Sequence, residues 1–313
     1  MGILIDVVLP VFLVIGFGYA AAWFGLLSEA SVDALMGFAI RFAIPSLLFL
    51  AISRIDLAAD FSAPLLASFF IGAFTAFVLG YLGARHLFAR SSEDAISIGF
   101  CALFSNTVLL GLPITERAYG TGSGALAGAF TIVSLHALII YAFGVTLMEV
   151  ARSRNSGIGP GLIRKILRAM SGNPILIGIA LGFIANLTNI WLPKSLLTGL
   201  GILAGAALPA ALFGLGGVLV RYRPEGDMKT IAWVTGLSLI VHPGVTYITG
   251  RWVFALEEPQ FRAAVLMAAM APGINAFLFA SMYNTAKRVA ASSVLIATGL
   301  SIFTVWVWLA ILP

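Results

Sequence analysis

The segment FSNTVLLGLPI, residues 104–114, lies in a long apolar run that would otherwise form one membrane-crossing helix. It contains three consecutive polar residues, Ser105, Asn106 and Thr107, followed by Gly111 and Pro113. Proline removes a backbone donor and clashes with the preceding turn, so the helix is expected to break at Pro113. Polar atoms and free backbone groups at membrane depth are tolerated only where they face protein or a water-filled cavity. The segment therefore predicts an interrupted helix that lines an internal site.

The composition of the chain identifies the environment of this segment. Of its 313 residues, 60% are hydrophobic and 10% are charged, whereas soluble domains carry about 25% charged residues. The chain is therefore predicted to be an all-α integral membrane protein. Its net charge of +5 comes from short loops that set topology, so no nucleic-acid partner is expected.

Apolar runs of about 20 residues, the length needed to cross a bilayer, occur ten times in the chain. The predicted spans cover residues 8–25, 32–52, 63–84, 94–116, 124–149, 174–190, 196–220, 230–251, 261–283 and 289–311. The polar linker 151–173 separates a first five-helix unit (1–150) from a second (174–313). Within the linker, GPGLIRKILRAM is expected to form a short basic helix on the membrane surface.

Basic residues predict the orientation of these spans. With both termini outside, twelve Lys and Arg residues lie in cytoplasmic loops and five lie in outer loops, while Arg41 is left inside a span. Cytoplasmic loops carry the excess of basic residues, so both termini are predicted to lie outside. The expected location is a bacterial inner (plasma) membrane, crossed several times.

Two motifs recur along the chain at a single offset. LPVFLVIGFGYAA (9–21) matches NPILIGIALGFIA (173–185), and IPSLLF (44–49) matches LPAALF (208–213). In both pairs the matched prolines are 164 residues apart. Because five crossings are an odd number, the second copy would insert upside down, an arrangement typical of transporters. The predicted fold is therefore ten transmembrane helices arranged as two inverted five-helix repeats.

The second repeat has its own interrupted span, MAPGINAFLFASMYN, residues 270–284. The broken fourth and ninth helices are predicted to cross at a substrate site near the midplane. Each break creates a half-helix N-terminus with free N–H groups and partial positive charge, which suits a carboxylate. A pair of packed structural kinks is the alternative interpretation. The predicted substrate-binding residues are Ser105, Asn106, Thr107, Gly111, Pro113, Pro272, Gly273, Asn275, Ser281 and Arg41.

Ionisable side chains inside spans are costly and suggest functional roles. Arg41 is interpreted as a fixed cation for an organic anion, or as a side chain that snorkels or pairs with a backbone carbonyl. His136 is a candidate for proton coupling, or a neutral histidine hydrogen-bonded across helices. His242 is expected to be structural. No acidic residue lies clearly mid-span, so a sodium site is disfavoured, and no metal or cofactor is predicted.

Four segments together resemble the auxin efflux carrier family, which includes plant PIN-FORMED transporters and bacterial malonate-permease-like proteins. They are FAIPSLLF (42–49), SNTVLLGLPI (105–114), MAPGINAFLFASMYN (270–284) and SSVLIATGLSIFT (292–304). The resemblance covers essentially the whole chain, although the long central hydrophilic loop of many plant members is missing and Trp306 stands where many relatives have proline. It implies a scaffold of spans one, two, six and seven, a transport domain of the other six spans, homodimerisation and an elevator-like motion.

The predicted function is a secondary transporter that moves small organic anions, such as carboxylates or auxin-like acids, by elevator-type alternating access. Its expected partners are the anion, the lipid bilayer and a second copy of the chain. An enzyme is not expected, because the HExxH and GxSxG motifs and paired mid-span aspartates are missing. A sodium-coupled organic anion symporter of the bile-acid type is the alternative, and a channel is less favoured because no charged or small-residue filter is seen.

Overall fold

The computed structural model describes residue 2 and residues 4–56, 61–152 and 172–313. In this part of the chain the regular structure is helical, and the only strand-like pairing is one isolated bridge. This confirms the all-α class. The surface helix predicted within the 151–173 linker falls on residues 153–171, which lie outside the described residues.

Seven helical stretches in the described residues are long and apolar enough to cross a membrane. They are Leu4–Trp23, Glu29–Ile52, Ala63–His86, Gly124–Arg152, Lys194–Leu219, Met228–Val253 and Lys287–Ile311. Each corresponds to one of the ten predicted spans. Of the other three, the sixth span is the shorter apolar helix Pro174–Thr188, and the fourth and ninth spans are each divided into shorter pieces.

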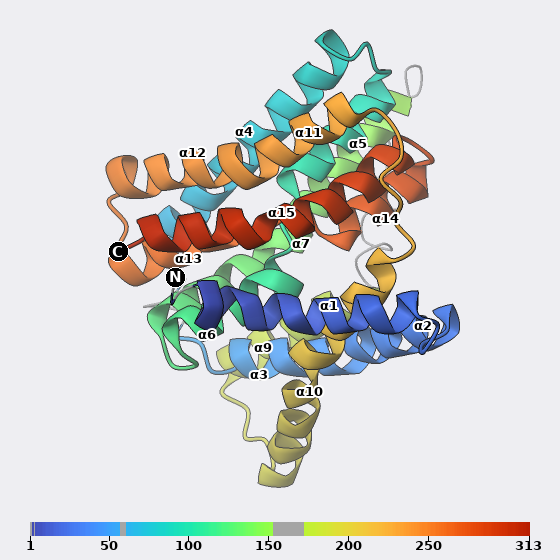
Figure 1. The fold of residues 1–313 in the computed structure, drawn as a ribbon. Coiled ribbons are helices and arrows are strands. Elements are labelled where there is room, and N and C mark those ends of the chain that lie inside the picture. The colour runs from blue at the N-terminus through green and yellow to red at the C-terminus, as the bar shows by residue number, and fades with distance from the viewer. Residues whose placement is uncertain (1, 3, 57–60, 153–171) are drawn as a thin grey trace.

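The elements keep the labels of Figure 1, and the wider π-helical turns are labelled η. In the first half they are η1 (Leu4–Val8), α1 (Leu9–Trp23), α2 (Glu29–Phe38), η2 (Ala39–Ala43), α3 (Ile44–Ile52), α4 (Ala63–His86), α5 (Ser92–Leu103), η3 (Thr107–Gly111), α6 (Leu112–Tyr119) and α7 (Gly124–Arg152). In the second half they are α9 (Pro174–Thr188), α10 (Lys194–Leu219), α11 (Met228–Gly236), η4 (Leu237–Val241), α12 (His242–Ile248), η5 (Thr249–Val253), α13 (Glu258–Ala268), α14 (Ile274–Tyr283) and α15 (Lys287–Ile311).

Prolines account for most of the π-helical turns. Each of η1, η2, η3 and η4 leads directly into an α-helix whose second residue is proline, namely Pro10, Pro45, Pro113 and Pro243. Proline lacks the N–H and crowds the carbonyl four residues earlier, so a wider turn before it relieves the clash and keeps the helix continuous. Pro209, the repeat partner of Pro45, lies inside the uninterrupted α10.

The helices are arranged in two layers, which are separated in Figure 1. The lower layer contains α1, α2, α3, α9 and α10, and the upper layer contains α4, α5, α7 and α11 to α15. Within the lower layer, α1 packs mainly on α10 and α3 packs mainly on α9. Both layers therefore draw helices from before and after the linker, so the two predicted five-helix units are interleaved in space.

Glycines bring the backbones of the lower layer together. A Cβ on Gly18 of α1 would lie 1.9 Å from the carbonyl oxygen of Phe213 in α10. A Cβ on Gly182 of α9 would lie 3.1 Å from the carbonyl oxygen of Phe49 in α3. Small residues allow such close helix packing in membranes. The two contacts are reciprocal, since each glycine of one motif copy meets the phenylalanine of the other.

Candidate functional site

The interruptions of the fourth and ninth spans lie against each other. The first separates α5 from η3 and α6, and the second separates α13 from α14. The Asn106 N–H donates to the Ala271 carbonyl at 2.8 Å, and the Gly273 N–H donates to the Phe104 carbonyl at 2.9 Å. These two bonds form the isolated antiparallel bridge. The interrupted helices therefore cross, and each satisfies backbone groups that the other has left free.

The first interruption lies earlier in the chain than the sequence predicts. The sequence places the break at Pro113, but the non-helical backbone is at residues 104–106, and Pro113 is the second residue of α6. The wider turn of η3 precedes this proline, relieves its clash with the preceding turn and keeps the helix continuous from Thr107 to Tyr119. Pairing with the second interruption, rather than proline, holds the break open. Pro272 does lie in the second interruption.

The first interruption ends with its own cap. Asn106 is 6% exposed, and its Oδ1 accepts the Leu109 N–H at 3.2 Å at the start of η3. The Asn106 carbonyl accepts further bonds from the N–H groups of Leu110 and Gly111. With Oδ1 engaged in this way, the side-chain NH2 group is the part of Asn106 that remains to donate to a ligand.

The second interruption has no side-chain cap. Gly273 is the N-cap residue of α14, and it offers no side-chain acceptor to the first turn. Its carbonyl accepts the Ala276 N–H at 3.0 Å, whereas the N–H groups of Ile274 and Asn275 belong to the first-turn donors that a helix cannot satisfy itself. The start of α14 therefore presents free donors and partial positive charge.

A cavity of about 310 Å³ adjoins the crossing. Six of the predicted residues line it: Ser105, Asn106, Thr107, His136, Gly273 and Asn275. Apolar side chains from both layers form much of the remaining wall, including Met36 and Ile40 of the lower layer and Val133 of the upper layer. None of the described lining residues carries a formal charge. The site therefore offers neutral hydrogen-bond donors and a helix end within an apolar enclosure.

Two buried histidines support the crossing. His242 Nδ1 lies 3.1 Å from the Ser105 hydroxyl, and His136 Nδ1 lies 3.4 Å from the Thr107 hydroxyl. Both rings pack edge-on against Phe69, with ring centroids 5.0 Å and 5.6 Å away. Each Nε2 is buried without a hydrogen-bond partner in the described residues. His242 therefore contacts the crossing in the same way as His136. Its position next to Pro243 in the sequence does not reveal this contact.

The other predicted residues lie away from this cavity. Gly111 faces α13, where an added Cβ would meet the Met267 sulfur at 2.5 Å. Pro113 lines a separate cavity of about 840 Å³ on the far side of the crossing. Pro272 is buried and pairs with Ser105 in the isolated bridge, and Ser281 lies near the end of α14. Arg41 is exposed on η2 and is not among the residues that line the cavity.

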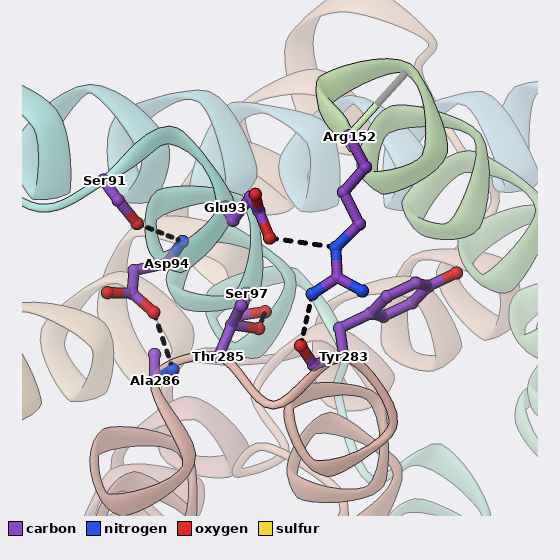
Figure 2. Close-up of polar contacts among 8 residues, drawn as sticks. All are labelled: Ser91, Glu93, Asp94, Ser97, Arg152, Tyr283, Thr285 and Ala286. Atoms are coloured by element: carbon purple, nitrogen blue, oxygen red, sulfur yellow. Dashed lines mark hydrogen bonds and ion pairs between the residues drawn. The ribbon is translucent and has the colours of Figure 1, made fainter. Parts of the chain in front are cut away.

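The far end of α14 is held by polar contacts, shown in Figure 2. Arg152, the last residue of α7, donates to the Tyr283 carbonyl, pairs with Glu93 at 2.9 Å and lies 5.0 Å from the centre of the Tyr283 ring. Beyond α14, the Ala286 N–H donates to Asp94 at 2.8 Å. A cation at a helix C-terminus complements its partial negative charge. Arg152 therefore fixes the short helix whose start lines the cavity.

Reasoning from the sequence misses two polar residues that line the cavity. Tyr141 lies in the same span as His136, and its hydroxyl is 3.5 Å from the Asn275 carbonyl. Asn173 caps α9 through the Ile175 N–H at 3.0 Å and also lines the cavity. The signal for Tyr141 was its position, five residues after His136 in the same apolar run. Nothing in the sequence indicates that the start of α9 reaches the crossing.

Comparison with known proteins identifies membrane transport proteins that are similar to nearly the whole chain. Residues 3–309 match the family described as membrane transport proteins. An uncharacterized transporter of Methanothermobacter thermautotrophicus is 28% identical over 314 residues, which is 98% of each chain. A putative malonate transporter of Rhizobium meliloti is 24% identical over 304 residues, 95% of this chain and 92% of the relative. Auxin efflux carrier component 1 of Arabidopsis thaliana is 26% identical over 136 residues, 42% of this chain and 21% of the relative. The chain is a multi-pass membrane protein that belongs to the auxin efflux carrier family of membrane transport proteins.

Proposed function

We propose that this protein is a secondary transporter of small organic anions and that the cavity at the crossing binds the carboxylate. The observation that carries this proposal is the uncapped start of α14, which faces the cavity beside Asn106 and Asn275. A helix N-terminus inside an apolar enclosure is a ready site for an anion. Transporters of known architecture place anionic groups of their substrates at such half-helix ends.

The charge of the bound anion is met without a cationic side chain in this proposal. Free N–H groups of the first turn of α14 and the NH2 group of Asn106 donate to the carboxylate, and the Asn275 side chain adds a further donor. Such neutral donors in a site of low dielectric bind an anion firmly. They also avoid the very strong attraction of a buried ion pair, which would slow release.

The apolar wall indicates the substrate class. Phe104, Tyr141 and Leu278 line the cavity together with apolar side chains of α2, η2 and α3. Pockets with a few placed donors and a hydrophobic lining select ligands that have both characters. Malonate and indole-3-acetate are suitable test substrates, because the relatives include a putative malonate transporter and auxin efflux carriers.

The ten-span inverted repeat and the elevator-type motion belong to this proposal. The reciprocal contacts of Gly18 with Phe213 and of Gly182 with Phe49 support the repeat, since each contact maps onto the other at the offset of 164. The motion is supported by two cavities on opposite sides of the crossing, one lined by Asn106 and one by Pro113. A scaffold formed by the lower layer would remain fixed while the upper layer moves.

The assembly and location are proposed on similar grounds. The lower layer exposes apolar side chains on α9, including Ile177, Leu181 and Ile184, which suits contact with lipid and with a second copy of the chain. The excess of basic residues places both termini outside the inner membrane. Neither the sodium-coupled symporter nor the channel is favoured by the similarity to auxin efflux carriers and a putative malonate transporter.

The proposal is tested by transport in proteoliposomes. Purified protein should give saturable uptake of radiolabelled malonate or indole-3-acetate, and unlabelled anion preloaded inside should accelerate it by counterflow. Vesicles without protein and vesicles containing the Asn275→Leu variant are the controls. Flux that rises linearly with anion concentration, without counterflow, would contradict a carrier.

A further inference from the structure

A third cavity, of about 500 Å³, lies between the two layers at the end of the molecule where α10 leads into α11. Its wall includes residues of α2 and α10 in the lower layer and of α14 and α15 in the upper layer. Six charged residues line it: Asp33, Arg221, Arg223, Glu225, Lys287 and Arg288. We name this cavity the basic vestibule.

The charges of the basic vestibule do not cancel. Arg221 pairs with Asp33 at 2.8 Å and also donates to the Glu29 carbonyl. Arg223, Lys287 and Arg288 make no ion pair with any described residue, and Glu225 is the only carboxylate left among the lining residues. The cavity therefore has an excess of positive charge.

The loop that carries Arg223 is fixed rather than loosely attached. Ser292 of α15 is fully buried, donates to the carbonyls of Arg223 and Glu225 at 2.9 and 2.8 Å, and accepts the Glu225 N–H at 3.0 Å. Beside it, the Tyr222 ring packs on Phe277 of α14 with centroids 4.9 Å apart. These contacts hold the cation of the loop next to the two cations that begin α15.

The basic vestibule leads to the candidate substrate site. Four residues line both cavities, namely Met36, Ile40, Ile274 and Leu278. One of them, Ile274, is the first residue of α14, whose start is the proposed carboxylate site. The cavity on the other side of the crossing is different, because its charged lining residues are one Glu116 and one Arg117. Of these two cavities, the basic vestibule has an excess of positive charge among its described lining residues, and the cavity lined by Pro113 does not.

We propose that the basic vestibule is a capture site for small carboxylate anions, from which they enter the cavity at the crossing. A cleft lined by charge of one sign raises the local concentration of the opposite ion and its rate of encounter, by about 10-fold to 1,000-fold. The inference rests on the proposed function and adds to it the side from which the anion is collected. Lipid headgroups share the anionic chemistry, but the continuity with the crossing favours a diffusing carboxylate.

The labelling rate of a thiol placed in the basic vestibule reports the electrostatic potential of the cavity and does not depend on transport. Cys101, the single native cysteine, is fully buried, so Ala291→Cys places an accessible thiol in the basic vestibule and Ala204→Cys places a matched one in the opposite cavity. The ratio of labelling rates with an anionic and a cationic methanethiosulfonate reagent should be about 10-fold higher at position 291 than at position 204. The difference should vanish at about 1 M salt, where screening acts within about 3 Å.

Neutralising the cations should remove this preference and slow capture. The variant Arg223→Gln/Lys287→Gln/Arg288→Gln should lower the ratio at position 291 to that at position 204 and raise KM for malonate or indole-3-acetate uptake about 5-fold at low salt, with kcat unchanged. A control variant with the same loss of charge, Arg54→Gln/Lys194→Gln/Arg251→Gln, alters exposed basic residues outside the cavities. It should change neither quantity.

The outcomes separate this inference from the proposed function. Equal labelling ratios at positions 291 and 204 would overturn the basic vestibule, whether or not the protein transports. A preference at position 291 that is lost in vesicles containing phosphatidylglycerol would show that lipid headgroups occupy the site, and would also overturn it. Absence of uptake by the native protein, with the preference intact, would instead count against the proposed function.

Discussion

The half-helices α6 and α14, which follow the two interruptions, end in the same way but begin differently. Each ends in tyrosine, Tyr119 or Tyr283, and the next residue has positive φ, +92° at Gly120 and +57° at Asn284. An arginine lies over each ring, Arg262 at 4.9 Å from the centre of Tyr119 and Arg152 at 5.0 Å from that of Tyr283. The two tyrosines are 164 residues apart, the offset of the repeated motifs.

The starts of the two half-helices differ in their side-chain caps. The first half-helix is continuous with η3, and Asn106 caps the start of η3 through the Leu109 N–H. The second begins at Gly273, which supplies no cap. A helix start that is buried without a cap is costly unless another group satisfies its donors. The comparison teaches that the capped start has a side-chain partner of its own, whereas the uncapped start keeps free donors, which the proposed anion would satisfy.

The largest effect is expected from Asn275→Leu, which removes a donor beside the uncapped start. Binding of a transported carboxylate should weaken by about 100-fold, because a hydrogen bond to a charged group contributes about 1.5–3 kcal/mol. Isothermal titration in detergent measures this. Asn284→Gly, on the same stretch but outside the cavity, should bind like the native protein. Native affinity in Asn275→Leu would place the anion elsewhere.

Two substitutions at Asn106 distinguish its role as the cap of η3 from its proposed role as a hydrogen-bond donor to the anion. Asn106→Ser keeps an oxygen that can cap η3 but loses the NH2 group, whereas Asn106→Leu loses both. Both should weaken binding about 10-fold, and only Asn106→Leu should lose about 1 kcal/mol of unfolding free energy, as expected for an N-cap. Thermal unfolding without ligand and titration with ligand measure the two effects. Unaltered binding by the serine variant would show that the amide is only a cap.

The two arginines at the far ends provide a matched pair. Arg152→Gln and Arg262→Gln should each lower the unfolding free energy by about 1 kcal/mol, since each removes an ion pair and a cation–π contact. Arg152→Gln should also weaken anion binding about threefold, because Arg152 holds the far end of α14, whose start lines the cavity. Arg262→Gln should leave binding unchanged. Equal effects of both variants on binding would remove the distinction between the half-helices.

A smaller effect is expected at the histidines that support the first interruption. If His136 couples transport to protons, His136→Gln should make uptake insensitive to an imposed pH gradient while counterflow exchange stays within about twofold of native. His242→Gln, which alters the contact with Ser105, is the matched variant and should keep the native pH response. Identical pH dependence in native protein and His136→Gln would leave His136 with an orienting role.

The smallest effect is expected from Arg41→Gln. The sequence predicts a role in anion binding for Arg41, but its exposed position on η2, outside the cavity, indicates an effect on carboxylate affinity below about twofold. Calorimetric titration of the variant and of the native protein with a carboxylate decides between a role in binding and a position outside the site. A loss of about 1–3 kcal/mol, the range for a hydrogen bond to a charged group, would restore the sequence-based assignment.

The sequence predicts the membrane class and the two interruptions because these follow from composition and from local chemistry. The sequence alone reveals the apolar runs, Pro272 and the polar residues 105–107, without knowledge of any tertiary contact. The break next to Asn106 could not be assigned, because it depends on backbone pairing with Ala271 and Gly273, more than 160 residues away. Proline often breaks a helix, but a wider π-helical turn such as η3 accommodates the proline without a break.

The lining of the site is predictable only where it lies next to the interruptions. Asn106, Thr107 and Asn275 are adjacent to the breaks, so reasoning from the chain finds them. Tyr141 and Asn173 reach the cavity through packing of other helices, which no local pattern encodes. Arg41 does not line the cavity, because helix rotation, which the sequence does not reveal, decides which way a mid-span charge points. Its role in anion binding stays a prediction.

The central claim is that the uncapped start of α14 and the neutral donors beside it recognise a carboxylate by its charge. The most direct measurement is calorimetric titration of the native protein and Asn275→Leu with malonate, indole-3-acetate and the corresponding amides. The account predicts that the native protein binds at least one of the two carboxylates and neither amide, and that Asn275→Leu loses this binding. Equal affinity for a carboxylate and its amide, or native affinity in Asn275→Leu, would contradict it.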